Sequence, residues 1–265
     1  MRLVGFAQCL FAIASAGLAL FMLAYGDFAP AGQSLPAWMP WRETWVHGSA
    51  GLVLAASAGL FFSRTALMSI LTIGAYLAAW ALLGIPLSEP LNVIGWYGFC
   101  EALSSLVGAW FLYTTLRRKS QGSQIPISGE RAARVARALF GITCVFYGWS
   151  HFAYADYTAT MVPSWLPGRL GITYLTGLGH IAAGIGLIIG ILPRLAATLE
   201  AIMVSLFSLL VWVPSFFMQP RPDWATPPQN QWSEFVVTVV LTAAVWLVAT
   251  SLRDRPWGFT APSRT

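Results

Sequence analysis

The candidate chemical groups in this sequence are the few ionisable side chains that fall within long apolar segments. His180 lies ten residues into the apolar segment 170–192, about 15 Å deep if that segment is a helix. Ionisable groups at such depth in a bilayer are costly and are functional candidates by default. A neutral imidazole there could donate a hydrogen bond to a ligand carbonyl or relay a proton. The alternative is a histidine that only hydrogen-bonds to a neighbouring helix.

A second group of candidates gathers near His151, at the outer end of another apolar segment. Trp149 precedes His151 and Asp156 follows it five residues later, so these side chains could form the polar mouth of a pocket. Trp165, in the aromatic loop that follows, completes this candidate ligand-binding set. The alternative is an interfacial histidine exposed to water, and the same interpretation applies to His47 at the mouth of its own segment.

Two glutamates also fall inside apolar segments and are candidate ligand-binding residues. Glu200 lies some five residues into its segment from the cytoplasmic side, and Glu101 lies a similar distance into its segment from the outside. The alternative is a structural ion pair with a nearby arginine, such as Arg194 for Glu200. Glu234 begins the last segment, where a carboxylate suits the positive end of a helix.

Several kinds of chemistry lack a motif here. The sequence has no glycine-rich phosphate loop, no nucleophile elbow and no HExxH zinc motif. The three histidines lack the close spacing of metal ligands, so no metal site is predicted. Cys9, Cys100 and Cys144 lie in apolar segments without CxxC spacing, which predicts small buried hydrophobes. No cofactor motif is evident, and a self-sufficient enzyme is not predicted.

The composition predicts an all-α integral membrane protein. Hydrophobic residues make up 57% of the 265 positions and charged residues only 9%, against about 25% in soluble domains. A span needs about 20 apolar residues. Eight transmembrane segments meet this length: 3–25, 46–63, 65–85, 96–116, 132–150, 170–192, 195–213 and 233–251. The first run is too long for the core of a cleaved signal peptide, so we expect a retained helix.

The basic residues predict the orientation in a bacterial inner membrane. Three flank the outer ends of the segments: Arg42, Arg169 and Arg221. Twelve flank the opposite ends: Arg2, Arg64, Arg117, Arg118, Lys119, Arg131, Arg134, Arg137, Arg194, Arg253, Arg255 and Arg264. This bias predicts cytoplasmic N- and C-termini. The net charge of +5 is then a topology signal, and the predicted partner is the lipid bilayer, not nucleic acid.

An internal repeat divides the chain into two halves. Trp96 and Trp110 match Trp232 and Trp246 at a common offset of 136. The loop punctuation matches too: Asp27-Phe28-Ala29 with His151-Phe152-Ala153, Pro36-Ala37-Trp38-Met39-Pro40 with Pro163-Ser164-Trp165-Leu166-Pro167, Arg64 with Arg194, and Pro86 with Pro214. We predict a four-helix unit over 1–116, a cytoplasmic linker over 117–131, a second unit over 132–252 and a cytoplasmic tail over 253–265. Because each unit has an even number of helices, the two units share one orientation.

The second half carries several ordered motifs: Gly148-Trp149-Ser150-His151-Phe152, Met161-Val162-Pro163-Ser164-Trp165-Leu166-Pro167-Gly168, Tyr174-Leu175-Thr176-Gly177, Gly184-Ile185-Gly186-Leu187 and Pro193-Arg194. Over about 120 residues this half resembles the DoxX family of bacterial membrane proteins, especially its MVPxWLP-containing branch. The first half resembles a diverged second copy without the histidine. The chain departs from the family where an acidic residue is common after Tyr-x-Thr-Gly, because it reads Leu178-Gly179-His180 there; no role that needs that carboxylate carries over.

The resemblance implies a four-helix membrane unit linked to quinone-coupled sulfur oxidation or to complexes that handle redox stress. The leading hypothesis is therefore a DoxX-like inner-membrane subunit that binds a quinone, or another amphipathic molecule, near His180 and His151 and acts with redox protein partners. A small-molecule transporter or exporter is the second hypothesis, because two parallel units with polar groups near the midplane suit alternating access. A membrane scaffold without a ligand is the third.

Overall fold

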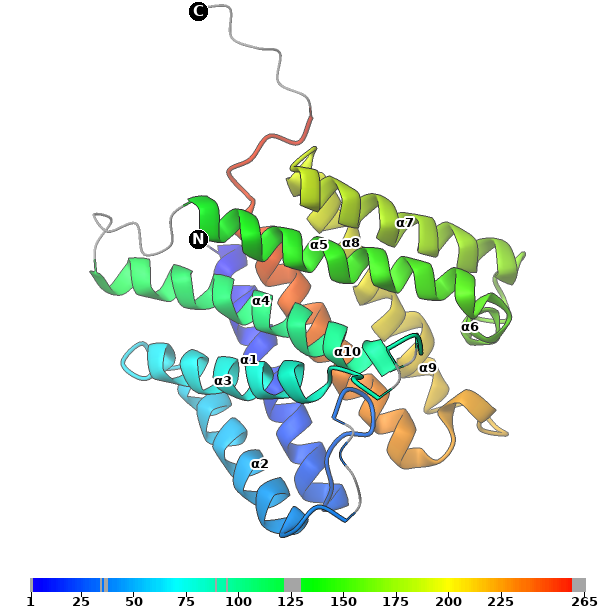
Figure 1. Cartoon of the computed structure of the whole chain (residues 1–265), viewed down its shortest axis with the longest axis horizontal. Helices are drawn as coiled ribbons and strands as arrows, with labels where there is room; N and C mark the ends of the chain where they lie inside the picture. The colour runs from blue at the N-terminus through cyan, green and yellow to red at the C-terminus, as the bar shows by residue number, and fades with distance from the viewer. Residues whose placement is uncertain are drawn as a thin grey trace, which may run out of the picture.

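The protein is built from helices. The computed structural model describes residues 2–33, 35, 38–88, 90–93, 95–121 and 130–258, and no strand occurs among them. In chain order (Figure 1) the elements are α1 (Arg2–Tyr25), α2 (Arg42–Gly59), α3 (Ala66–Leu83), α4 (Gly95–Gln121), α5 (Glu130–Ala153), α6 (Ala155–Met161), α7 (Arg169–Ile189), α8 (Pro193–Phe207), the π-helical turn η1 (Ser208–Trp212), α9 (Val213–Ser215), the 3-10 turn η2 (Asp223–Ala225) and α10 (Pro228–Ser251). The predicted all-α class is confirmed.

The structure supports fewer membrane spans than the sequence analysis predicts. By length and composition, six stretches can cross a membrane: Gly5–Tyr25, Ala66–Leu83, Gly95–Lys119, Arg169–Ile189, Pro193–Ser215 and Pro228–Ser251. The chain is therefore a multi-pass membrane protein. Helices α2 and α5 are not among the six, since ionisable residues occupy their first turns: Arg42, Glu43 and His47 in α2, and Glu130, Arg131, Arg134 and Arg137 in α5. Eight spans remain a prediction.

Several element boundaries differ from the expected ones. Helix α4 continues to Gln121 and α5 begins at Glu130, so helical structure takes both ends of the predicted linker. Basic side chains in the last turn of α4 favour that extension, because they complement the negative end of a helix. The rest of the linker, 122–129, lies outside the described residues, as do residues 36, 37, 89 and 259–265.

The helices pack as two layers that share α4 and α10. In the first half α1 contacts α2, α2 contacts α3, and α3 contacts α4. In the second half α5 lies along α7, α7 contacts α8, and α8 contacts α10. Across the middle α1 packs on α10, α4 on α5, and α4 on α10. Two apolar cores result, one among α1, α2, α3, α4 and α10, and one among α4, α5, α7, α8 and α10.

The ends of the helices sort onto two sides of the molecule (Figure 1). The starts of α1 and α5, the ends of α4 and α10, and the turns between α2 and α3 and between α7 and α8 lie towards one side. We call this the arginine-rich side, since most of the basic residues flank these helix ends. Helix α6 and the segment before α10 lie at the opposite side, which we call the His151 side.

Two of the loops on the His151 side differ in how deeply they are buried. The segment between α1 and α2 turns back into the protein, where Phe28, Ala29 and Gln33 are buried. The Gln33 side chain accepts a hydrogen bond from Ala29 N (3.1 Å), and its Nε2 donates to the Tyr76 hydroxyl (2.6 Å). By contrast, none of the residues 154–168 between α5 and α7 is buried. The loop after α1 therefore packs between the helices of the first half, whereas the loop that contains α6 stays at the surface of the second half.

Candidate functional site

A buried histidine–glutamate pair lies between α7 and α8. His180 Nδ1 is 2.7 Å from Glu200 Oε1, and the side chains are only 3% and 1% exposed. His180 stands ten residues before Gly190, which ends α7, and Glu200 ten residues after it. Because the two helices are antiparallel with the same rise per residue, equal spacing from the turn brings both side chains to the same depth.

The turn that makes this pairing possible has its own local cause. Gly190 ends α7 with φ of +79°, a left-handed conformation that glycine adopts at little cost. Leu192 also has positive φ, and Pro193 opens α8 at a position where its missing N–H would have no helical partner. The sequence analysis expected Glu200 to pair with Arg194 if it were structural. Instead the Arg194 guanidinium lies over the Trp257 ring, 4.0 Å from its centroid, and donates to Arg255 O.

His151 of α5 lies next to the pair, in the direction away from the arginine-rich side. Its ring centroid is 5.2 Å from that of His180. Its Nδ1 lies 3.0 Å from Thr176 Oγ1 and 3.2 Å from Thr173 O. Since the Thr176 hydroxyl already donates to the backbone oxygens of Ile172 and Thr173, its oxygen accepts from Nδ1–H of His151. That assignment leaves the Nε2 of His151 without its proton when the ring is neutral.

The three polar groups meet because α5 and α7 touch at glycine. A Cβ at Gly148 would lie 2.5 Å from Gly177 O, and one at Gly184 would lie 2.5 Å from Gly141 O. Such contacts are possible only where neither helix carries a side chain, which is how small residues let helices approach in a membrane. The close approach carries His151 to within ring contact of His180.

Aromatic and thiol side chains complete the surroundings of the pair. Phe207 packs on both imidazoles, with centroids 6.0 Å from His151 and 5.7 Å from His180. Tyr147 lies 6.0 Å from His180, and Cys144 faces the Glu200 carboxyl. The sequence analysis missed all three. Cys144 and Tyr147 stand seven and four residues before His151, a spacing that puts them on one helix face and could have found them.

Phe207 lies seven residues after Glu200 on the same face of α8, and directly after it the helix has a break that the sequence analysis did not foresee. At η1 the chain changes to a π-helical turn, in which Val213 N donates to Ser208 O, five residues earlier. Pro214 follows, and proline has no N–H and clashes with the carbonyl four residues back in a regular helix. Single π-turns of this kind often occur at functional sites. Pro214 was the available signal.

Hydrogen-bonding groups are unevenly satisfied at the centre of this site. Within the described residues, the hydrogen bonds of both imidazoles involve only Nδ1, and the Nε2 atoms have none. Glu200 Oε2 is buried and also has no partner there. Buried polar atoms are normally paired, so such orphaned atoms call for an explanation. The arrangement can hold a proton between Glu200 and His180 and offer Nε2 to a further polar group.

The remaining candidates near His151 lie away from this pair. Trp149 is half exposed and contacts Phe146 on the outer face of α5. Trp165 is 69% exposed, and Asp156 is exposed on α6. No hydrogen bond, ion pair or ring contact joins these three to His180 in the part of the chain that the structure describes. The predicted polar mouth therefore consists of His151 and the threonines of α7 rather than of the loop residues.

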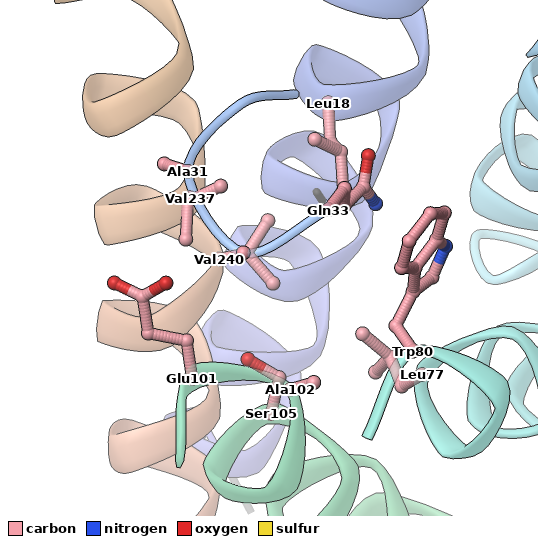
Figure 2. Close-up of a pocket in the computed structure, with 11 residues that line it drawn as sticks. Leu18, Ala31, Gln33, Leu77, Trp80, Glu101, Ala102, Ser105, Val237 and Val240 are labelled. Carbon is pink, nitrogen blue, oxygen red and sulfur yellow. The ribbon is translucent and has the colours of Figure 1, made fainter. Parts of the chain in front are cut away.

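Glu101 belongs to a different place, between α4, α10 and the buried loop after α1. It lines a small cavity of about 30 Å³ together with Gly32, Gln33, Trp80 and Ser105, which is room for one or two water molecules. Figure 2 shows its carboxyl beside α10, away from Gln33 and Trp80. Gly32 has φ of +73°, and a Cβ there would lie 3.1 Å from Glu101 Oε2.

A second carboxylate, Glu234 of α10, lies within electrostatic range of Glu101. Glu234 also acts on Tyr157 of α6, where burial and then this carboxylate raise the pKa of the phenol. Glu101 and Glu234 are therefore neighbours at the His151 side, under α6. They are separate from the pair formed by His180 and Glu200, so the two glutamates predicted as candidates do not share one site.

The other polar residues fall into structural roles. A chain of hydroxyls links α4 to α5: Ser104 Oγ lies 2.7 Å from Thr143 Oγ1 and 3.3 Å from Tyr147 Oη, and Tyr97 is hydrogen-bonded to Ser150. His47 is exposed and bonds only the Glu43 carbonyl in its own helix.

The three cysteines differ in their burial. Cys100 and Cys144 are buried as predicted, whereas Cys9 is exposed on the outer face of α1, which corrects the expectation for that residue. Across the described ranges, no group of three or more His, Cys, Asp or Glu could hold a metal ion.

Comparison with known proteins gives one match. Comparisons with curated proteins and with solved structures found no significant match to the chain. Residues 132–212 match the family model described as DoxX. The matched segment runs from the start of α5 to η1, so it contains His151, His180 and Glu200 and supports the membership of this segment in the DoxX family.

Proposed function

We propose that the protein is a DoxX-like membrane subunit that works with quinone-linked or redox-stress oxidoreductases and binds the head group of a lipid-soluble ligand at His151 and His180. The observation that carries the proposal is the buried pair of His180 and Glu200, with atoms 2.7 Å apart and His151 in ring contact. A polar pair inside lipid is costly and is functional by default. The family match covers this segment and adds the association with redox systems as an expectation.

The donor set at the site fits a carbonyl ligand. His180 shares a proton with Glu200 through Nδ1; when that proton resides on Glu200, Nε2–H of His180 is a free donor. A quinone offers two carbonyl oxygens that accept such bonds, and when bound it supplies two-electron, two-proton redox chemistry. Phe207 and Tyr147 offer apolar ring surfaces beside the donors. Glu200, with its unpaired Oε2, is suited to hold the proton that the ligand needs.

The ligand test is the quinone content of gently purified protein. We expect sub-stoichiometric quinone in extracts of the wild-type protein and at least a tenfold loss in His180→Ala, because the donor is gone. The matched control is His47→Ala, which removes an exposed imidazole from the other half of the molecule and should keep the quinone. Full retention of quinone in His180→Ala would count against the proposal.

The two halves of the chain form, in this proposal, two tandem four-helix units of one orientation with eight spans. Three observations support it. Equivalent helices make equivalent contacts: α1 packs on α10 as α5 packs on α4. At the crossing of α4 and α10, a Cβ on Gly108 would lie 2.6 Å from Ala244 Cα, and these residues are 136 apart, the offset of the tryptophan repeat. A contact between equivalent residues is what a pseudo-twofold axis along the membrane normal produces. The arginine-rich side also gathers both unit boundaries, which favours cytoplasmic termini.

One observation favours a second candidate function, a small-molecule transporter. Transporters often bind substrate where membrane helices are interrupted, and α8 is interrupted at η1 beside Phe207. Uptake or efflux of candidate solutes in proteoliposomes separates the two functions. Flux that falls in Pro214→Ala, with no quinone in the purified protein, would favour transport over the redox role.

A further inference from the structure

The buried pair of His180 and Glu200 lies near the middle of α7, and its surroundings differ in polarity towards the two sides of the protein. Towards the His151 side, polar groups continue from it: His151 and Thr176 are partly exposed, and Thr173, which is buried, lies beside His151. The loop above these residues has no buried member. A graded series of polar groups, from buried to partly exposed, is the kind of path that admits water and polar head groups.

Towards the arginine-rich side, the same bundle is closed. Phe140, Leu187, Ala197 and Ala201 are all 0% exposed and belong to one apolar core. Arg137 Nε donates to Leu187 O (2.8 Å) and ties α5 and α7 together at this end. Such a region lacks the polar groups that a buried water molecule needs as hydrogen-bond partners.

The first half of the chain provides a comparison within the same molecule. There the loop after α1 sends Phe28 and Gln33 into the helix bundle and fills the corresponding opening. In the second half, the loop that contains α6 stays outside the bundle. Only the half that holds the histidines therefore keeps an approach from the His151 side.

We infer that water and the ligand reach the His180–Glu200 pair only from the His151 side, so that any redox partner that consumes or supplies the ligand acts on that side. The identity of the ligand rests on the function proposed above, but the direction of access does not. A molecule with a polar head group at the membrane surface opposite the arginine-rich side is the substrate class that this route selects. A cytosolic solute is not.

The experiment measures thiol accessibility from each side. Cys9→Ser and Cys144→Ser remove the exposed thiol and the thiol that faces Glu200, and the remaining Cys100 is buried, so we expect no background modification. Thr176→Cys and Ala197→Cys are introduced singly into that protein. Each is treated with a charged, membrane-impermeant methanethiosulfonate in right-side-out and in inverted vesicles. An epitope tag at the C-terminus reports which side is exposed, so the result does not depend on the assumed topology.

We expect modification of Thr176→Cys from the side opposite the tag, at a rate at least tenfold above that from the tag side. Ala197→Cys should stay unmodified from both sides. Modification of Ala197→Cys from the tag side, or of Thr176→Cys only from that side, would overturn the inference. If either variant fails to fold, Ala183→Cys and His151→Cys repeat the comparison at neighbouring positions. Thr176→Cys modified as expected in a protein that binds no quinone would sink the proposed ligand and leave the direction of access standing.

Discussion

The pairing of His180 with Glu200 is the residue-scale observation on which the proposed function depends. An isolated charge in the membrane interior costs several kcal/mol, whereas a hydrogen-bonded His–Glu pair can exist with a shared proton and no net charge. Phe207 and Tyr147 pack beside the His180 ring and the pair is buried, so the local dielectric is low and the shared hydrogen bond is strong. The same low dielectric makes each partner costly to bury without the other.

A double-mutant cycle tests that mutual dependence. Because each single alanine leaves a buried polar partner unsatisfied, we expect His180→Ala and Glu200→Ala each to lower the free energy of unfolding in detergent by about 1–3 kcal/mol. The double mutant should lose less than the sum, with a coupling energy of at least about 0.5 kcal/mol. Glu200→Gln, which still accepts from Nδ1, should be milder. Strictly additive losses would show that the two side chains do not stabilise each other.

At the scale of elements, two devices position the pair. The antiparallel turn around Gly190 sets the depth of His180 against that of Glu200. The glycine contacts between α5 and α7 then set the distance of His151 from the pair. Both depend on backbone geometry rather than on the chemistry of the side chains that they position.

The glycine contacts can be tested with a matched pair of substitutions in α7. In Gly184→Ala the new methyl group would lie 2.5 Å from Gly141 O and 2.9 Å from Val145 N, so α5 must move. We expect a loss of about 1–3 kcal/mol of unfolding free energy and a lower Tm. Gly171→Ala is the control, since a Cβ there has nothing within 4 Å, and its better helix propensity should leave Tm unchanged or raise it. Equal Tm shifts would contradict the close packing.

At the scale of the whole molecule, the main feature is that the two halves differ in how their interiors are filled. In the half with α1 to α4, Gln33 and Trp80 fill the space between the helices. Among the residues that line its small cavity, Glu101 is the ionisable one. The half with α5 to α10 keeps the histidines and the open approach. In the proposed duplication, the first unit supports the second through α1 on α10 and α4 on α10.

The orientation of the whole molecule is testable with reporters. Because basic residues concentrate on the arginine-rich side, we expect a fluorescent protein fused to the C-terminus to fluoresce in the cytoplasm. Alkaline phosphatase fused at the same position should be inactive, and the same enzyme fused within the loop that contains α6 should be active. The opposite pattern would invert the proposed topology without affecting the packing of the helices.

The sequence by itself determined the class and the approximate place of the long helices, and it singled out His180, His151 and Glu200 as candidates. Apolar length and the cost of ionisable groups in lipid are local properties, so they can be read along the chain. Only the tertiary structure decided the partners, because pairing depends on helix phase and on close glycine contacts between distant segments. Glu200 thus pairs with His180 instead of Arg194, Phe207 packs on the His180 ring, and Trp165 and Asp156 fall outside the site.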